Sequence, residues 1–163
     1  MITETIAAYS AGIIDGDGSI LVAKRKKRFS SRVIVGQSER RWELLDFLAS
    51  IFVGAELYGP YQSSLKNRSR TKLIIWNGEY AVNLIGIVRP YLLLKTKQAD
   101  LVVHFQEMIR AHKLGGRICW RNNLLDKALV YHKKSRQLNE DGILVDEEIT
   151  PILSKEPIGL FEW

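Results

Sequence analysis

The sequence contains a single cysteine, Cys119, among its 163 residues. It therefore cannot form an intrachain disulfide or a zinc site built from several cysteines. Long hydrophobic runs are also lacking, since the apolar stretch around residues 51–53 is far shorter than the roughly 20 residues needed to cross a bilayer. The first five residues carry no basic segment and include Glu4, which argues against a secretion or transit signal. These absences predict an intracellular protein, located in the cytoplasm or in an organelle, with no membrane partner.

Acidic residues are concentrated at the C-terminal end of the chain. The net charge is +6, but residues 139–163 contain seven acidic side chains against one lysine, Lys155, so this segment carries −6 and residues 1–138 carry +12. Such an excess of positive charge favours a polyanionic partner, although charge alone does not distinguish DNA, RNA and an anionic membrane. We predict one domain over residues 1–138, followed by an acidic C-terminal extension over residues 139–163.

Hydrophobic periodicity and the positions of glycine and proline predict the order helix, strand, strand, helix, strand, strand, helix, helix, with a further helix behind. The expected helices cover residues 5–15, 41–52, 79–88, 96–113 and 123–137, and the expected strands cover 19–27, 32–36, 56–63 and 71–76. We place the turn of the first strand pair near residues 29–31 and the N-cap of the second helix at Ser38. Two hairpins with helices on one side give an α+β domain whose four-stranded antiparallel sheet keeps one face open.

Residues 10–18 read Ser-Ala-Gly-Ile-Ile-Asp-Gly-Asp-Gly and resemble the LAGLIDADG motif, departing from its pattern at the first position, where Ser10 replaces leucine. The resemblance extends to the element order, to Gln37 followed by Arg40-Arg41-Trp42, and to residues 90–99, Pro-Tyr-Leu-Leu-Leu-Lys-Thr-Lys-Gln-Ala. Together these features resemble the LAGLIDADG homing endonucleases of the single-motif, homodimeric, intron-encoded type. The resemblance implies their αββαββα fold, with a DNA-binding sheet backed by helices and with extra C-terminal helices.

Small residues recur at helical spacing within and before the motif. Ala8, Gly12 and Gly16 follow one another four residues apart, and Ala11 and Asp15 do the same alongside them. Such a face lets two helices approach closely, either inside one domain or between two chains. The resemblance implies the second arrangement, a homodimer with two-fold symmetry whose interface contains Ala8, Ala11, Gly12 and Asp15.

The acidic residue Asp17 is the principal candidate for catalysis. A two-fold axis beside the helix would bring two Asp17 carboxylates together, and a cation between them would relieve their repulsion. The resemblance implies that Asp17 and the main-chain carbonyl of Gly16 bind Mg²⁺, with Mn²⁺ able to substitute and Ca²⁺ binding without supporting cleavage. It also implies catalytic roles for Gln37, Arg40 and Lys95 beside Asp17.

An alternative interpretation uses the same motif residues. Residues 15–20 resemble the start of a calcium-binding EF-hand loop. The twelfth position of that loop requires a bidentate glutamate and is Lys26 here, which disfavours this interpretation.

Basic residues gather in the two expected hairpins. Six cations occupy residues 24–32 without an acid, and four more lie between residues 66 and 72. Strand alternation predicts Ile20, Val22, Val33 and Val35 in the core. The residues that we expect to contact DNA, as base-reading side chains on the open face or as phosphate contacts at the tips, are Ser19, Leu21, Ala23, Arg25, Lys27, Arg28, Arg32, Ile34, Tyr61, Ser63, Lys66, Arg68, Arg70, Lys72 and Ile74.

The resemblance implies a site-specific homing endonuclease, encoded within an intron, that acts on double-stranded DNA. It would make a double-strand break with 3′ overhangs in a long pseudo-palindromic target by metal-dependent phosphodiester hydrolysis. Two alternatives share this fold. One is an RNA maturase that binds the host intron RNA and assists its splicing, and the other is a DNA-binding regulator that does not cleave.

Overall fold

The computed structural model describes residues 2–62, 69–114 and 117–141. Its elements are α1 (Glu4–Asp17), β1 (Gly18–Arg25), β2 (Arg28–Ser38), the 3₁₀ helix η1 (Glu39–Arg41), α2 (Trp42–Ile51), β3 (Glu56–Tyr61), β4 (Thr71–Asn77), α3 (Glu79–Val88), the 3₁₀ helix η2 (Arg89–Tyr91), α4 (Thr96–Ala111), β5 (Lys113–Leu114), β6 (Arg117–Ile118) and α5 (Asn122–Asp141). Within these ranges, no helix has the length and apolarity that a bilayer crossing requires.

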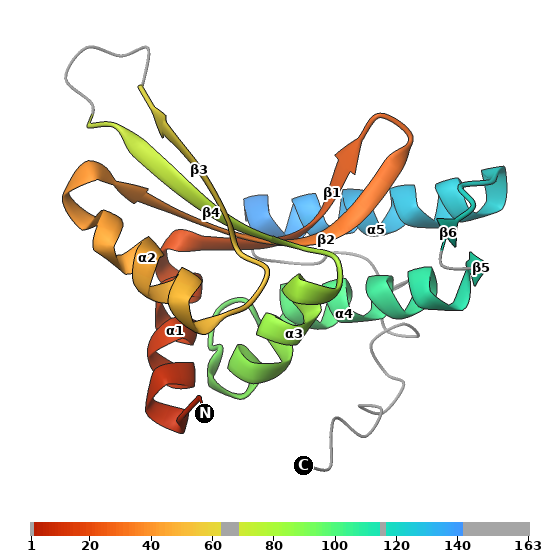
Figure 1. Ribbon diagram of the computed structural model, residues 1–163. Coiled ribbons are helices and arrows are strands. Elements are labelled where there is room, and N and C mark those ends of the chain that lie inside the picture. The colour runs from red at the N-terminus through yellow and green to blue at the C-terminus, as the bar shows by residue number, and fades with distance from the viewer. Residues whose placement is uncertain (1, 63–68, 115–116, 142–163) are drawn as a thin grey trace.

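The predicted α+β architecture with a four-stranded antiparallel sheet is confirmed. The strand order is β1-β2-β4-β3, and a separate two-stranded sheet pairs β5 with β6. Helices α1 to α4 lie below the sheet in Figure 1, and no described helix covers its upper face. The sheet curves so that the β1–β2 turn and the adjacent ends of β3 and β4 rise on either side of this open face (Figure 1).

The hydrophobic core fills the space between the sheet and the helices. Ile20, Val22, Val33 and Val35 are fully buried there, as strand alternation predicts. Trp76 on β4 is the largest fully buried side chain, and its indole N–H donates to the main-chain oxygen of Phe52 at 3.2 Å. The helices are therefore attached to one face of the sheet by side chains that alternate with those of the open face.

Helix α1 is longer than predicted and leads directly into β1. It begins after Thr3, whose hydroxyl accepts from the amide of Ile6, and it continues through Gly16 to Asp17. Its end requires glycine at position 18, because a Cβ there would lie 2.7 Å from the main-chain oxygen of Ile14. The residues that follow Asp17 form a strand, which contradicts the EF-hand alternative.

The β1–β2 turn lies at Lys26 and Lys27, so its predicted position at residues 29–31 is wrong. Lys26 takes a positive φ of 56° at the turn. Phe29 is buried against Trp120, with ring centroids 5.6 Å apart, and the Ser31 hydroxyl donates to Gln106 Oε1 at 2.7 Å. These contacts with residues far along the chain hold positions 28–31 in β2.

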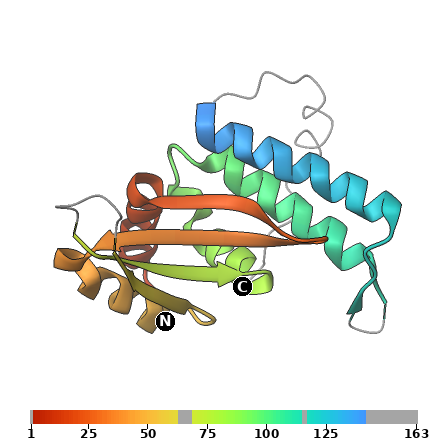
Figure 2. The same ribbon diagram turned by 90° about the horizontal axis from the view of Figure 1, so that it is seen from above.

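Helix α5 covers the outer edge of β1 (Figure 2). The buried hydroxyl of Ser135 accepts from the amide of Val22 at 3.1 Å, and Nδ1 of His132 bonds to the main-chain oxygen of Val22 at 2.7 Å. The Asn139 side chain donates to the main-chain oxygen of Ile20 at 3.0 Å. Since α5 continues to Asp141, the domain boundary that we predicted after residue 138 falls inside a helix.

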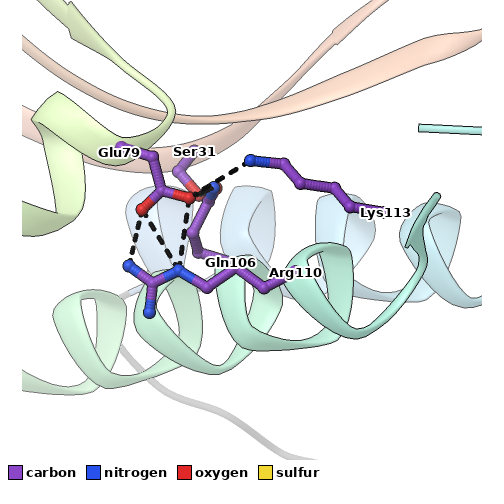
Figure 3. A network of polar contacts seen from close by, with 5 residues as sticks. All are labelled: Ser31, Glu79, Gln106, Arg110 and Lys113. Carbon is purple, nitrogen blue, oxygen red and sulfur yellow. Dashed lines mark hydrogen bonds and ion pairs between the residues drawn. The ribbon is translucent and has the colours of Figure 1, made fainter. Parts of the chain in front are cut away.

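A polar network joins α3 and α4 to β2 (Figure 3). Glu79 accepts from Gln106 at 3.0 Å and from Arg110 at 2.5 Å, and Lys113 lies 3.5 Å away. The hydrogen bonds from Arg110 lower the pKa of Glu79 to about 2, with partial burial acting in the opposite direction. Because Gln106 also accepts from Ser31, this network fixes β2 relative to the helices below it.

Candidate active site and nucleic-acid face

The C-terminal end of α1 brings Asp17 next to Gln37. Asp17 is exposed, whereas Gln37 is only 5% exposed on the helix-facing side of β2. The Gln37 side-chain amide donates to Asp17 Oδ2 at 2.5 Å. One carboxylate oxygen of Asp17 is thus held by a neutral donor, in a position set by the core packing of β2.

Lys95 reaches the same end of α1 from the segment between η2 and α4. Its ammonium group donates to the main-chain oxygen of Asp15. The Asp15 carboxylate accepts from the main-chain amides of Leu93, Leu94 and Lys95 at 2.7, 3.2 and 3.0 Å. Asp17, Gln37 and Lys95, three of the four predicted catalytic residues, are therefore gathered within one turn of the helix end.

The fourth predicted catalytic residue, Arg40, does not contact this group. It is exposed on η1, beyond the end of β2, and forms no hydrogen bond or ion pair with other described residues. Its link to the site stays a prediction based on the resemblance.

The donors at the end of α1 fit a hard divalent cation only in part. Asp17 offers a carboxylate, and Gly16 lies on the exposed side of the helix end. Over the described ranges, no three His, Cys, Asp or Glu side chains are grouped in a way that would hold a metal ion. This small donor set is compatible with Mg²⁺, which keeps several waters and takes ligands from substrate phosphates, but it is insufficient for a cage made by one chain.

The open face of β1 and β2 carries most of the side chains that we predicted there. Register pairs Ser19 with Ile34 and Leu21 with Arg32, and all four are partly exposed. Arg25 pairs with Arg28 next to the turn, and both are exposed, as is Lys27. Ala23 belongs to the same face by register but is only 9% exposed, so its neighbours leave it little surface for a ligand.

The prediction for β4 was wrong, because Lys72 and Ile74 lie on the helix side of the sheet and not on its open face. Ile74 pairs with Val35 and is fully buried in the core, so it cannot contact DNA. Lys72 pairs with Gln37 on the helix side, where its ammonium group lies 4.2 Å from the centre of the Trp42 ring. The side chains of β4 that share the open face with Arg32 and Ile34 are Thr71, Leu73, Ile75 and Asn77.

The second hairpin is only partly within the described ranges. Tyr61 pairs with Thr71 on the open face and is exposed, as predicted. Arg70 is also exposed, but it forms an ion pair with Glu39. Ser63, Lys66 and Arg68 lie outside the described residues.

The small-residue face of α1 is exposed at Ala8, Gly12 and Gly16. A Cβ at either glycine would meet no heavy atom of the described residues within 4 Å, so no described part of the chain covers this surface. One of the predicted interface residues is corrected, because Ala11 is fully buried in its own core. The Asp15 carboxylate is bound to the chain's own residues 93–95, and its place at an interface stays a prediction.

Sequence reasoning missed exposed apolar residues beside this face. Tyr9 and Phe47 form an edge-to-face pair with centroids 5.9 Å apart, and both are more than a third exposed. Leu93 and Leu94, next to the end of α1, are 86% and 74% exposed. Hydrophobic periodicity gave no signal for them, because their exposure depends on which helices lie next to α1.

The element order, the open antiparallel sheet and the acidic end of α1 define the fold of the LAGLIDADG homing endonucleases. The homing endonuclease I-CvuI in complex with its target has a TM-score of 0.66 and 18% identity, over 93% of this chain and 94% of that one. The LAGLIDADG meganuclease I-AabMI bound to uncleaved DNA has a TM-score of 0.61 and 17% identity, over 86% of this chain and 50% of that one. I-TnaI, a further homing endonuclease, has a TM-score of 0.58 and 15% identity, over 92% of this chain and 96% of that one. At the level of sequence, no family model and no curated protein matches the chain.

Proposed function

We propose that the chain is a LAGLIDADG homing endonuclease that cleaves double-stranded DNA at a specific site. The observation that carries this proposal is the meeting of Asp17, Gln37 and Lys95 at the end of α1, where β1 begins. A carboxylate can bind a cation, and an ammonium group can stabilise the negative charge that develops during phosphodiester hydrolysis.

The open face of the sheet is proposed as the DNA-binding surface. A two-stranded ribbon fits the major groove, and Leu21, Arg32 and Ile34 extend from its outer face. The arginines and lysines of the β1–β2 turn are exposed, and we propose that they contact phosphates beyond that groove. The structures of I-CvuI and I-AabMI contain DNA, which supports the same partner for this chain.

The proposed active form is a homodimer with two-fold symmetry. The chain matches almost the whole of I-CvuI but only half of I-AabMI, and it carries one copy of the motif. One chain supplies a single Asp17, so two strands of DNA call for two chains. The uncovered face of Ala8, Gly12 and Gly16 would let two α1 helices approach and bring both Asp17 carboxylates near the axis.

Within each site we assign a separate role to each side chain. Asp17 and the carbonyl of Gly16 would hold Mg²⁺, which supplies Lewis-acid activation of the phosphodiester and of the attacking water. I-CvuI structures containing Ca and containing Mg are consistent with a divalent cation. Gln37 orients Asp17 through the 2.5 Å hydrogen bond. Lys95 places a compact positive charge where the phosphate becomes more negative.

The product that we propose is a double-strand break with 3′ overhangs in a long pseudo-palindromic target. We also propose that the protein is encoded within an intron and that it is intracellular. The maturase and the non-cleaving regulator are not favoured by a particular feature of the structure, so they enter only as outcomes of the test.

The test uses the purified full chain, a randomised DNA library and Mg²⁺, with sequencing of the cut ends. We expect 3′ overhangs at one related set of sequences. Asp17→Asn should lower the cleavage rate by at least about 100-fold, as for loss of a charged group at a transition state, while DNA binding persists. Asp46→Asn, which changes an exposed carboxylate on α2, is the matched control and should cleave normally.

Three outcomes would contradict the proposal. Asp17→Asn cleaving at the normal rate would remove Asp17 from the site. Sequence-specific binding without any cleavage by the unaltered protein would indicate the regulator. Splicing of an intron RNA by a protein that cleaves no DNA would indicate the maturase.

A further inference from the structure

We propose that Asp15 is the positioning residue for Lys95, and that it acts on both the main chain and the ammonium group of this lysine. The inference rests on the proposed nuclease function and goes beyond it by assigning Asp15 a role within one chain. The resemblance had implied a place for this residue at the interface between chains.

The carboxylate of Asp15 binds three consecutive main-chain amides. Oδ2 accepts from Leu93 and Leu94 at 2.7 and 3.2 Å, and Oδ1 accepts from Lys95 at 3.0 Å. Successive amides that converge on one anion form a strong and directional anion site. Both carboxylate oxygens are used, so the orientation of the segment leading into α4 is fixed by Asp15.

The side chains of this segment supply little other support within the chain. Leu93 and Leu94 are 86% and 74% exposed, so their burial does not hold the segment in place. Leu92 is buried before it, and α4 begins after it at Thr96. The Thr96 hydroxyl donates to the main-chain oxygen of Leu92 at 3.1 Å and joins these two points, and the three amides between them are held by Asp15.

The second contact fixes the other end of Lys95. Its ammonium group donates to the main-chain oxygen of Asp15, two residues before Asp17. The positive charge is therefore aligned with the end of α1 that carries Asp17 and Gly16. Because Lys95 has a long flexible side chain, holding it at both ends reduces the number of conformations that must be excluded before it can act on a phosphate.

The principal test is a double-mutant cycle on cleavage of the DNA target by the dimeric protein. Asp15→Asn keeps the size of the side chain but loses the charge and one acceptor oxygen. We expect cleavage to slow by about 10- to 100-fold, the equivalent of losing hydrogen bonds to a charged group. DNA affinity measured with Ca²⁺ should stay within about twofold, and Asp46→Asn should behave as the unaltered protein.

The cycle separates positioning from a general structural role. In a Lys95→Ala background, Asp15→Asn should slow cleavage by less than about threefold, because the group that it positions is gone. Losses that multiply would show that Asp15 acts independently of Lys95 and would overturn the proposal. Should Asp15→Asn not fold, Asp15→Glu keeps the charge and displaces it by one methylene, and the same coupling to Lys95→Ala is expected.

A second readout is independent of catalysis. The amides of Leu93, Leu94 and Lys95 should be protected from hydrogen exchange in the unaltered protein and should exchange faster in Asp15→Asn, with the amides of α4 unchanged. Unprotected amides in the unaltered protein would overturn the proposal even if the enzyme is active. A protein that cleaves no DNA but shows this protection would contradict the nuclease assignment while supporting the contact made by Asp15.

Discussion

One of the side chains of α5 that bind the covered edge of β1 is a buried hydroxyl, and its removal gives a quantitative test of the fold. Ser135 is fully buried, accepts from the amide of Val22 at 3.1 Å and donates to the main-chain oxygen of His132 at 3.1 Å. Ser135→Ala removes the acceptor and leaves the Val22 amide buried without its partner. An unpaired buried donor costs about 1–3 kcal/mol, so we expect the free energy of unfolding to fall by about 2 kcal/mol.

For a chain of this length, a loss of that size corresponds to a fall in Tm of about 4–8 °C. The measurement is equilibrium urea unfolding followed by circular dichroism, together with a thermal scan. Ser50→Ala is the matched control, because its hydroxyl is exposed and donates within α2 to the main-chain oxygen of Phe47. The control should change the free energy of unfolding by less than about 0.5 kcal/mol.

The refuting result is equal stability of Ser135→Ala and the unaltered protein at the same urea dependence. It would mean that the amide of Val22 does not depend on α5 in solution. Equal losses in Ser135→Ala and Ser50→Ala would refute the reasoning in another way, since burial of the hydroxyl would then make no difference.

Three further outcomes are expected. Ile74→Ala should lower the free energy of unfolding by about 2–5 kcal/mol, as for other core truncations. Ile75→Ala on the open face should lower it by less than about 1 kcal/mol and weaken DNA binding in titrations. Equal losses of stability would refute the register of β4. Glu79→Gln should lower the free energy of unfolding by about 1 kcal/mol near neutral pH. The expected loss is small because the glutamate side chain is 41% exposed and solvent screens its ion pair. Because the pKa of folded Glu79 is about 2 and its ordinary value is 4.5, this contribution is complete above pH 4.5 and disappears as the pH falls through 2, so acid titrations of the two proteins should converge. Gly18→Ala should cost about 1–3 kcal/mol in urea unfolding, because its Cβ would lie 2.7 Å from a main-chain oxygen; unchanged stability would contradict that close approach.

Local signals in the sequence were sufficient where they agreed with the tertiary packing. Helix α3 has the predicted bounds of residues 79–88, because Gly78 and Pro90 mark its two ends. Alternation along β1 correctly placed Ile20 and Val22 in the core. In β4 the signal failed, because residues 73–76 are all apolar and show no alternation from which to read the phase.

Contacts between distant segments could not be predicted from local patterns. The polar side chains of α5 that bind the edge of β1 have no hydrophobic period, so nothing in residues 132–139 indicated this role. The motif resemblance predicts that Asp17 and Lys95 belong to one site. It did not reveal that Asp15 binds the segment carrying Lys95, because that contact joins positions 80 residues apart.

The alternation of side chains along β1 and β2 has a consequence for how such a protein changes over generations. Neighbouring residues on one strand have different roles. Ile20 on β1 and Val33 on β2 are buried in the core, while the adjacent Leu21 and Arg32 face outward. A substitution at an outward position costs little stability, so under the proposed function a preference for a new DNA sequence would be acquired one side chain at a time. If the proposed DNA target changes its sequence, the outward residues can change with it while the buried residues of the same strands keep the fold intact.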